Sequence, residues 1–86
     1  LLICDEIFTG FYRTGEFLAS YKAQIEPDLI CLSKGLTGGF LPLALTVTSQ
    51  KIYDAFLSDH IQTAFLHGHS YTGNPMACAA AHATFG

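Results

Sequence analysis

The sequence predicts an α/β fold with a mostly parallel sheet and flanking helices. Its apolar runs are short and continuous, which is typical of strands covered on both faces in a parallel sheet. Two of these runs stop at charged residues, Asp5-Glu6 and Lys34, and glycines follow the second run. Ligands bind at the carboxyl ends of the strands in open α/β sheets, so both run ends are candidate site positions.

The first half of the chain is expected to hold two strands and one short helix. Residues 1–4 and residues 29–32 are the apolar runs that predict the strands. Between them, residues 16–23 fit a helix that places Phe17 and Tyr21 one turn apart. Glycine and proline in the intervening segments predict loops and turns.

The second half is expected to hold one more strand and two helices. Residues 43–48 are rich in aliphatic and β-branched side chains and predict the third strand. Ser49 is a favourable N-cap for a helix over residues 50–58. Asn74 can cap an alanine-rich helix over residues 75–84, which has proline at its first position.

The composition indicates a folded chain that is small for an independent domain. It has 86 residues, of which 50% are hydrophobic and 13% charged, and this composition excludes a disordered protein. Domains of this size bury only about 60% of their unfolded surface and usually need disulfides or a metal. Because neither is evident, we expect residues 1–86 to be part of a larger domain that is incomplete at both ends.

Charge and cysteine usage exclude several classes of protein. The net charge is −3, and the basic patch that a nucleic-acid-binding protein needs is absent. No apolar run is long enough for a membrane span. Cys4, Cys31 and Cys78 form no C-x-x-C motif, so we expect free thiols. Free thiols predict a reducing compartment, the cytoplasm.

Lys34 and Asp5 are the first candidate site residues. A lysine at a strand end can attack a carbonyl and form a Schiff base, although many such lysines are simply solvated. The glycine at position 35 favours Schiff-base formation, because it lets a bulky ligand approach the backbone. Asp5 can hold a cationic ring nitrogen, or it can cap the next turn. Glu6 can bond to the nearby loop backbone or to a substrate, and the structural role is the favoured one.

Polar residues before the last helix form a second candidate site. Ser70 and Thr72 offer hydroxyls near a helix N-terminus, which suits a phosphate but also suits ordinary capping. His67 and His69 have the spacing of a metal-binding pair. Together with the acidic pair at the first strand end, they would form a metal-dependent hydrolase site.

Several stretches of the chain together resemble the signature of class III pyridoxal-phosphate aminotransferases. These stretches are LICDEI (2–7), GFYRTG (10–15) and DLICLSKGLTGG (28–39). The stretch HGHSYTGNP (67–75), followed by ACAAA (77–81), resembles the downstream phosphate-contacting loop and helix of that family. The resemblance runs through nearly all of the chain.

This resemblance implies a fold and an activity. The chain would be a fragment of the large domain of a fold-type I transferase that depends on pyridoxal 5'-phosphate. The full-length enzyme would be a homodimer that transfers an amino group between small-molecule substrates, with no nucleic acid or membrane as partner. Most of the cofactor pocket would lie outside these residues. The fragment alone is therefore expected to be inactive.

The resemblance also implies roles for individual residues. Lys34 would form the Schiff base and then carry a proton, and Asp5 would pair with the pyridine nitrogen of the cofactor. Ser70 stands where the family usually has threonine, and it would contact the cofactor phosphate from the neighbouring subunit. Thr72 would be a second phosphate ligand. The remaining candidates are two loop residues that would bind substrate, Gly68 and His69, and one residue interpreted as structural, Arg13.

Overall fold

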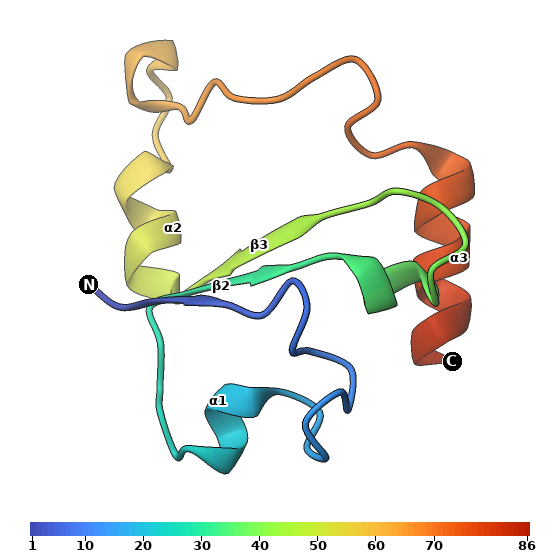
Figure 1. Cartoon of the computed structure of the whole chain (residues 1–86). Coiled ribbons are helices and arrows are strands. Elements are labelled where there is room, and N and C mark those ends of the chain that lie inside the picture. Colours follow the sequence, from blue (N-terminus) through green and yellow to red (C-terminus); the bar gives the residue numbers. More distant parts are fainter.

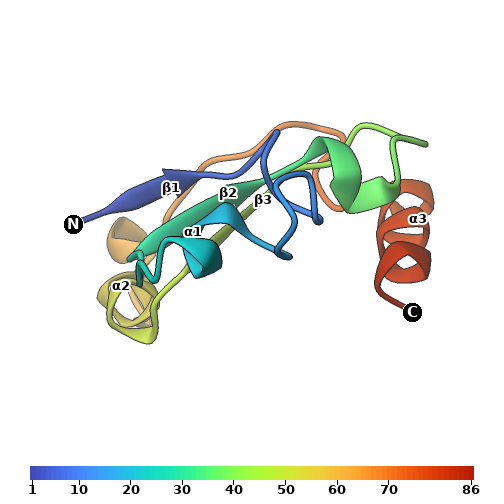
Figure 2. The ribbon, with the colours of Figure 1, turned by 60° about the horizontal axis from the view of Figure 1, so that its bottom comes forward.

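A three-stranded mixed sheet forms the centre of the molecule. The computed structural model describes all of residues 1–86. The strands are β1 (Ile3–Asp5), β2 (Leu29–Leu32) and β3 (Leu45–Thr48), in the order β1-β2-β3. β1 and β2 run parallel, as predicted, whereas β2 and β3 run antiparallel (Figures 1 and 2).

The register of the parallel pair sets the site edge. Asp5, the last residue of β1, lies opposite Cys31 of β2. The ladder continues one step further, because the N–H of Glu6 donates to the carbonyl of Cys31 at 2.9 Å. The carboxyl ends of β1 and β2 therefore meet at one edge, with Lys34 only two residues beyond the end of β2.

Helices lie at both ends of this sheet. Figures 1 and 2 show α2 at one end and α3 at the other, beside the carboxyl ends of β1 and β2. α3 packs against the short 3-10 helix η1, which begins at Lys34. The helices and 3-10 helices are α1 (Ala19–Lys22), η1 (Lys34–Thr37), α2 (Gln50–Phe56), η2 (Ile61–Thr63) and α3 (Pro75–Phe85).

The antiparallel β3 departs from the mostly parallel sheet that was expected within this chain. A parallel return needs a crossover connection of a dozen or more residues, usually a helix. Here the connection reverses direction at Gly38 and Gly39, whose φ angles of +66° and +81° are left-handed. The chain therefore turns back beside β2. Ser49 precedes α2 as predicted, but its side chain makes no capping hydrogen bond.

Coverage of the strands is the second departure. The apolar runs predicted strands buried on both faces, yet all four residues of β3 are exposed, and Leu45 retains 43% of its surface. Only 9 of the 86 residues are buried, and no helix of the chain packs extensively on the sheet. The apolar pattern predicts that both faces of the sheet are buried, but the helices of residues 1–86 do not cover them. The buried apolar side chains are Leu18, Leu32, Leu36, Ala77 and Ala81.

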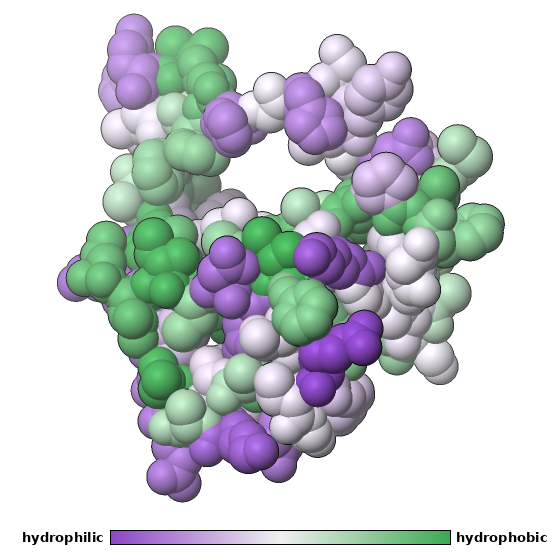
Figure 3. Space-filling view, in the orientation of Figure 1, coloured by the Kyte–Doolittle hydropathy of each residue, from purple (hydrophilic) through white to green (hydrophobic).

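The segment between α2 and α3 stands away from the body. Residues 57–74 contain only η2 and run as an otherwise irregular strap from one end of the sheet to the other. In the space-filling view, an opening separates this strap from the rest of the molecule (Figure 3). Aromatic contacts order part of it, because Phe65 stacks edge-to-face on Phe56 with 5.4 Å between ring centroids. None of the helices has the length and hydropathy of a membrane span.

Candidate functional site

Asp5 presents an exposed carboxylate at the carboxyl end of β1. Its Oδ1 accepts a hydrogen bond from the N–H of Ile7 at 3.0 Å. This bond fixes the direction of the carboxylate while leaving Oδ2 free for a donor outside the chain. The predicted turn-capping contact is therefore present, and it does not use the whole acceptor capacity of Asp5.

Glu6, the neighbour of Asp5, is buried and has a structural part, as expected. Its carboxylate accepts from the N–H groups of Ala19 and Ser20 at 3.0 and 2.8 Å, and from the hydroxyl of Thr9. The two N–H groups belong to the first turn of α1, where the helix itself supplies no acceptor. Burial raises the pKa of Glu6, but these hydrogen bonds lower it, and the net pKa lies below its usual value.

Lys34 begins η1 in an unusual backbone conformation. Its φ is +45°, in the left-handed region that costs a residue with a Cβ about 1 kcal/mol. The side chain is exposed, and its ammonium lies over the ring of Phe8, with 5.1 Å between Nζ and the ring centroid. The guanidinium of Arg13 lies 5.6 Å from the centroid of the same ring. Strained backbone of this kind is concentrated at functional sites.

A cavity of about 890 Å³ opens beside Lys34. Arg13 also lines it, and no aspartate or glutamate does. Glycines 35, 38 and 39 form part of its wall, so the backbone is accessible there, as the glycine-rich sequence predicted. The space next to the Lys34 amine is therefore open and carries positive charge.

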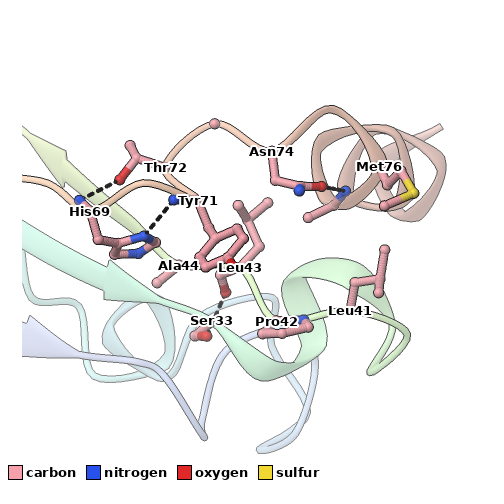
Figure 4. A pocket seen from close by; sticks show the side chains of 12 residues that line it. Ser33, Leu41, Pro42, Leu43, Ala44, His69, Tyr71, Thr72, Asn74 and Met76 are labelled. Carbon is pink, nitrogen blue, oxygen red and sulfur yellow. Dashed lines mark hydrogen bonds between the residues drawn. The ribbon is translucent and has the colours of Figure 1, made fainter.

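The loop before α3 lines a different cavity, of about 550 Å³ (Figure 4). The hydroxyl of Thr72 accepts from the N–H of His69 at 3.0 Å, and Nδ1 of His69 accepts from the N–H of Tyr71 at 3.1 Å. Figure 4 shows the ring of Tyr71 directed towards the segment 41–44. Asn74 caps α3 as predicted, because its Oδ1 accepts from the N–H of Ala77 at 3.1 Å.

The structure brings together some predicted site residues and separates others. Asp5 and Lys34 follow paired strands at one edge of the sheet. Thr72 and His69 line the second cavity, which does not include Lys34. Ser70 and Gly68 are exposed in the same loop. The two cavities share only the wall residues Ser33, Leu41 and Pro42.

The structure does not assemble the four residues of the metal-site hypothesis. No group of three or more histidine, cysteine, aspartate or glutamate side chains is placed to hold a metal ion. The ring of His67 packs beside Phe65 instead, with 5.6 Å between centroids. The carboxylate of Glu6 is occupied by α1. The metal-dependent hydrolase therefore has no structural support in this chain.

Two residues near Lys34 were missed at the sequence level. Phe8 makes the aromatic contact with the Lys34 ammonium, and no local sequence pattern predicts a contact between residues 26 positions apart. Ser33 directly precedes the lysine, and its hydroxyl donates to the carbonyl of Leu43 at 2.6 Å. That bond ties the start of η1 to the segment leading into β3. A hydroxyl next to a candidate nucleophile was a usable signal for Ser33.

Comparison with known proteins gives one family. The model of the class III aminotransferases matches residues 1–86. An adenosylmethionine-8-amino-7-oxononanoate aminotransferase of Synechococcus elongatus is 62% identical over 84 residues, which are 98% of this chain and 20% of that protein. The Staphylococcus aureus protein of the same name is 56% identical and is matched over 94% of this chain and 18% of its own length.

Solved structures agree with this result. The Methanocaldococcus jannaschii protein of that name has a TM-score of 0.86 and 47% identity, with 96% of this chain and 20% of that chain covered. An amine transaminase from an uncultivated Pseudomonas species, solved with pyridoxal phosphate bound, has a TM-score of 0.89 and 45% identity, with 98% and 19% covered. The chain thus spans about a fifth of the length of the relatives it matches.

Proposed function

Because this chain belongs to the class III aminotransferase family, we propose that residues 1–86 form part of the large domain of an aminotransferase that uses pyridoxal 5'-phosphate. The observation that carries the proposal is the placement of Asp5 and Lys34 at the carboxyl ends of two adjacent parallel strands. An amine and a carboxylate at one sheet edge are the two protein groups that this cofactor needs at opposite ends of its ring.

The residues present fit that cofactor. Asp5 is exposed, and one of its carboxylate oxygens accepts no hydrogen bond from the chain, so it can accept the N–H of a protonated pyridine ring. Lys34 is exposed beside an open cavity without acidic side chains, so it would hold the cofactor at its aldehyde group. When bound, pyridoxal phosphate supplies the electron sink for transamination.

The chain itself would contribute orientation and proton transfer. The Ile7 N–H holds the Asp5 carboxylate in one direction, and that carboxylate would favour the protonated form of the ring nitrogen. The amine of Lys34 would take a proton from the substrate Cα and deliver it to C4′ of the cofactor. Its left-handed backbone and the ring of Phe8 would set the line along which Nζ approaches.

The loop residues would act across a dimer interface. We propose that Ser70 and Thr72 contact the cofactor phosphate of the neighbouring subunit, and that Gly68 and His69 contact its substrate. Their exposure supports this proposal, as does a loop cavity that excludes Lys34 of the same chain. The enzyme would then be a homodimer in which each active site uses residues of both chains.

We propose S-adenosylmethionine as amino donor and 8-amino-7-oxononanoate as acceptor, giving 7,8-diaminononanoate in biotin biosynthesis. Curated relatives of 62% and 56% identity carry the corresponding name. The stretches KGLTGGFLPLA (34–44) and HGHSY (67–71) also resemble that enzyme more than other members of the family. A class III ω-amino acid or amine transaminase is the second candidate, because an amine transaminase structure matches the chain with a TM-score of 0.89.

The test uses the full-length protein with pyridoxal phosphate. Product formation from each donor is followed by mass spectrometry, with S-adenosylmethionine, a simple amine and an ω-amino acid offered in parallel. We expect formation of the diamino product with S-adenosylmethionine, and its complete loss in Lys34→Ala. Preferred use of the amine or the ω-amino acid would select the second candidate. Full activity in Lys34→Ala would refute both candidates.

A further inference from the structure

We propose that Glu6 is a positioning residue for Asp5: by anchoring the end of β1 from the buried side, it holds the Asp5 carboxylate at the open edge of the sheet. This inference rests on the proposed function, in which Asp5 contacts the cofactor ring. Glu6 itself is only 2% exposed and would touch neither cofactor nor substrate.

Glu6 joins four segments of the chain. Its N–H donates to the carbonyl of Cys31 in β2 at 2.9 Å, and its own carbonyl accepts from the N–H of Gly10 at 3.0 Å. Its carboxylate accepts from Thr9 and from the first turn of α1, through the bonds described above. One residue thus fixes the end of β1 to β2, to α1 and to the turn that follows.

The alternation of side chains transmits this anchoring to Asp5. Adjacent residues at a strand end point to opposite faces, so a Glu6 side chain held inside requires Asp5 to point outwards. The observed burial agrees, because Asp5 is exposed while Glu6 is buried. A rotation that released Glu6 would carry the Asp5 carboxylate away from the edge where Lys34 lies.

The same turn holds the Asp5 carboxylate directly. The N–H of Ile7 donates to Oδ1 of Asp5, and Ile7 lies between the two fixed points at Glu6 and Gly10. The turn is tightly closed, because a Cβ at Gly10 would lie 2.9 Å from the carbonyl oxygen of Glu6. The donor to Asp5 therefore keeps its place only while Glu6 keeps its bonds.

Substitution of Glu6 by glutamine tests this in the full-length holoenzyme. The side chain keeps its size, but an NH₂ group replaces one acceptor oxygen and faces N–H donors. We expect the absorption maximum of the bound cofactor to shift in the same direction as in Asp5→Asn. We also expect kcat to fall about tenfold or more, with KM changed less than about twofold, because a small displacement of a reacting group has costs of this order.

A matched control separates positioning from stability. Ile52 is half-buried in α2, which lies at the other end of the sheet from the turn that carries Asp5, so Ile52→Ala lowers the stability of the fold without changing that turn. It should lower the midpoint of thermal unfolding while leaving the absorption maximum as in the wild type. If Glu6→Gln does not fold, Thr9→Val is the second test of the proposal. It removes only the hydroxyl donor to Glu6, so it should shift the absorption maximum in the same direction by a smaller amount.

The outcomes separate this inference from the proposed function. A wild-type spectrum and kcat in Glu6→Gln, beside an altered Asp5→Asn, would overturn the role of Glu6 alone. An equal spectral shift in Ile52→Ala would also overturn it, because the effect would then follow stability. A wild-type spectrum in Asp5→Asn would overturn the assigned role of Asp5, and the inference about Glu6 with it.

Discussion

The ring of Phe8 lies beside the ammonium of Lys34, with 5.1 Å between Nζ and the ring centroid. The two residues come from different strand ends, since Phe8 follows β1 and Lys34 follows β2. Arg13 approaches the same ring at 5.6 Å. One exposed aromatic side chain thus links the candidate nucleophile to the loop that carries the only arginine.

This contact predicts a measurable coupling between Phe8 and Lys34. A cation over an aromatic face at an exposed position contributes about 0.5–1 kcal/mol. In a double-mutant cycle with Phe8→Leu and Lys34→Met in the full-length apoprotein, we expect a coupling free energy of this size from urea unfolding. Phe40→Leu is the control, because Phe40 lines the cavity beside Lys34 but has no cation over its ring. A coupling as large for Phe40 would contradict the assigned contact.

The buried carboxylate of Glu6 predicts a pH-dependent stability. Burial raises its pKa and the hydrogen bonds from Thr9, Ser20 and Ala19 lower it, so that the folded value lies below 4.5. The unfolded chain therefore binds more protons than the folded chain in the interval below 4.5. The stabilisation is present above that pH and is lost as the pH falls through the folded pKa.

We therefore expect the free energy of unfolding of the wild type to fall more steeply below pH 4.5 than that of Glu6→Gln. Urea unfolding at constant ionic strength over this range measures both slopes. The glutamine variant should be less stable at neutral pH, because an amide cannot accept all three bonds. Parallel slopes in the two proteins would show that Glu6 is not the group responsible.

Gly10 predicts a severe packing effect. A Cβ there would lie 2.9 Å from the carbonyl oxygen of Glu6 and 3.4 Å from a methyl group of Leu32. Both neighbours are buried, so Gly10→Ala should destabilise the full-length protein by about 1–3 kcal/mol. Thermal unfolding measures this loss. Gly68→Ala is the control, because its Cβ would meet only the exposed side chain of Thr72, and a loss of equal size there would count against the assigned clash.

Much of this local architecture was predictable from the sequence, and the reasons for the rest are physical. The strand over residues 29–32 was located correctly, because an apolar run bounded by Pro27 and a charged residue has clear ends. The helix beginning at Pro75 carried an N-cap signal that the structure confirms. The parallel pairing of β1 and β2 was predicted correctly, whereas the antiparallel direction and the exposure of β3 were not, because both depend on partners outside the local window.

The candidate site likewise contains features that the local sequence predicts and features that depend on distant parts of the chain. The positions of Asp5 and Lys34 followed from the ends of two apolar runs, and the parallel pairing of β1 and β2 confirms that they share an edge. Phe8 was missed, because contacts between separate loops depend on how the strands pair. The environment of Glu6 was predicted only as backbone bonding in general, since its donors lie 13 and 14 residues away.

The cap of α3 predicts a moderate loss of stability. Asn74 accepts from the N–H of Ala77, and Ala77 is buried. Replacing this acceptor by alanine leaves a helix N–H without a partner, which costs about 1 kcal/mol. We expect Asn74→Ala to lower the free energy of unfolding by that amount and Asn74→Asp to restore most of it. An alanine variant as stable as the wild type would show that the cap is dispensable.

The left-handed backbone of Lys34 predicts a conflict between stability and activity. Its φ of +45° carries a steric cost for any side chain with a Cβ, and glycine avoids this cost. Lys34→Gly should therefore be more stable than Lys34→Ala by about 1 kcal/mol, although glycine usually destabilises a helical position by a similar amount. Both variants remove the amine, so both should lack transaminase activity. Urea unfolding of the full-length apoproteins decides the matter: an alanine variant at least as stable as the glycine variant would mean that the lysine backbone carries no strain.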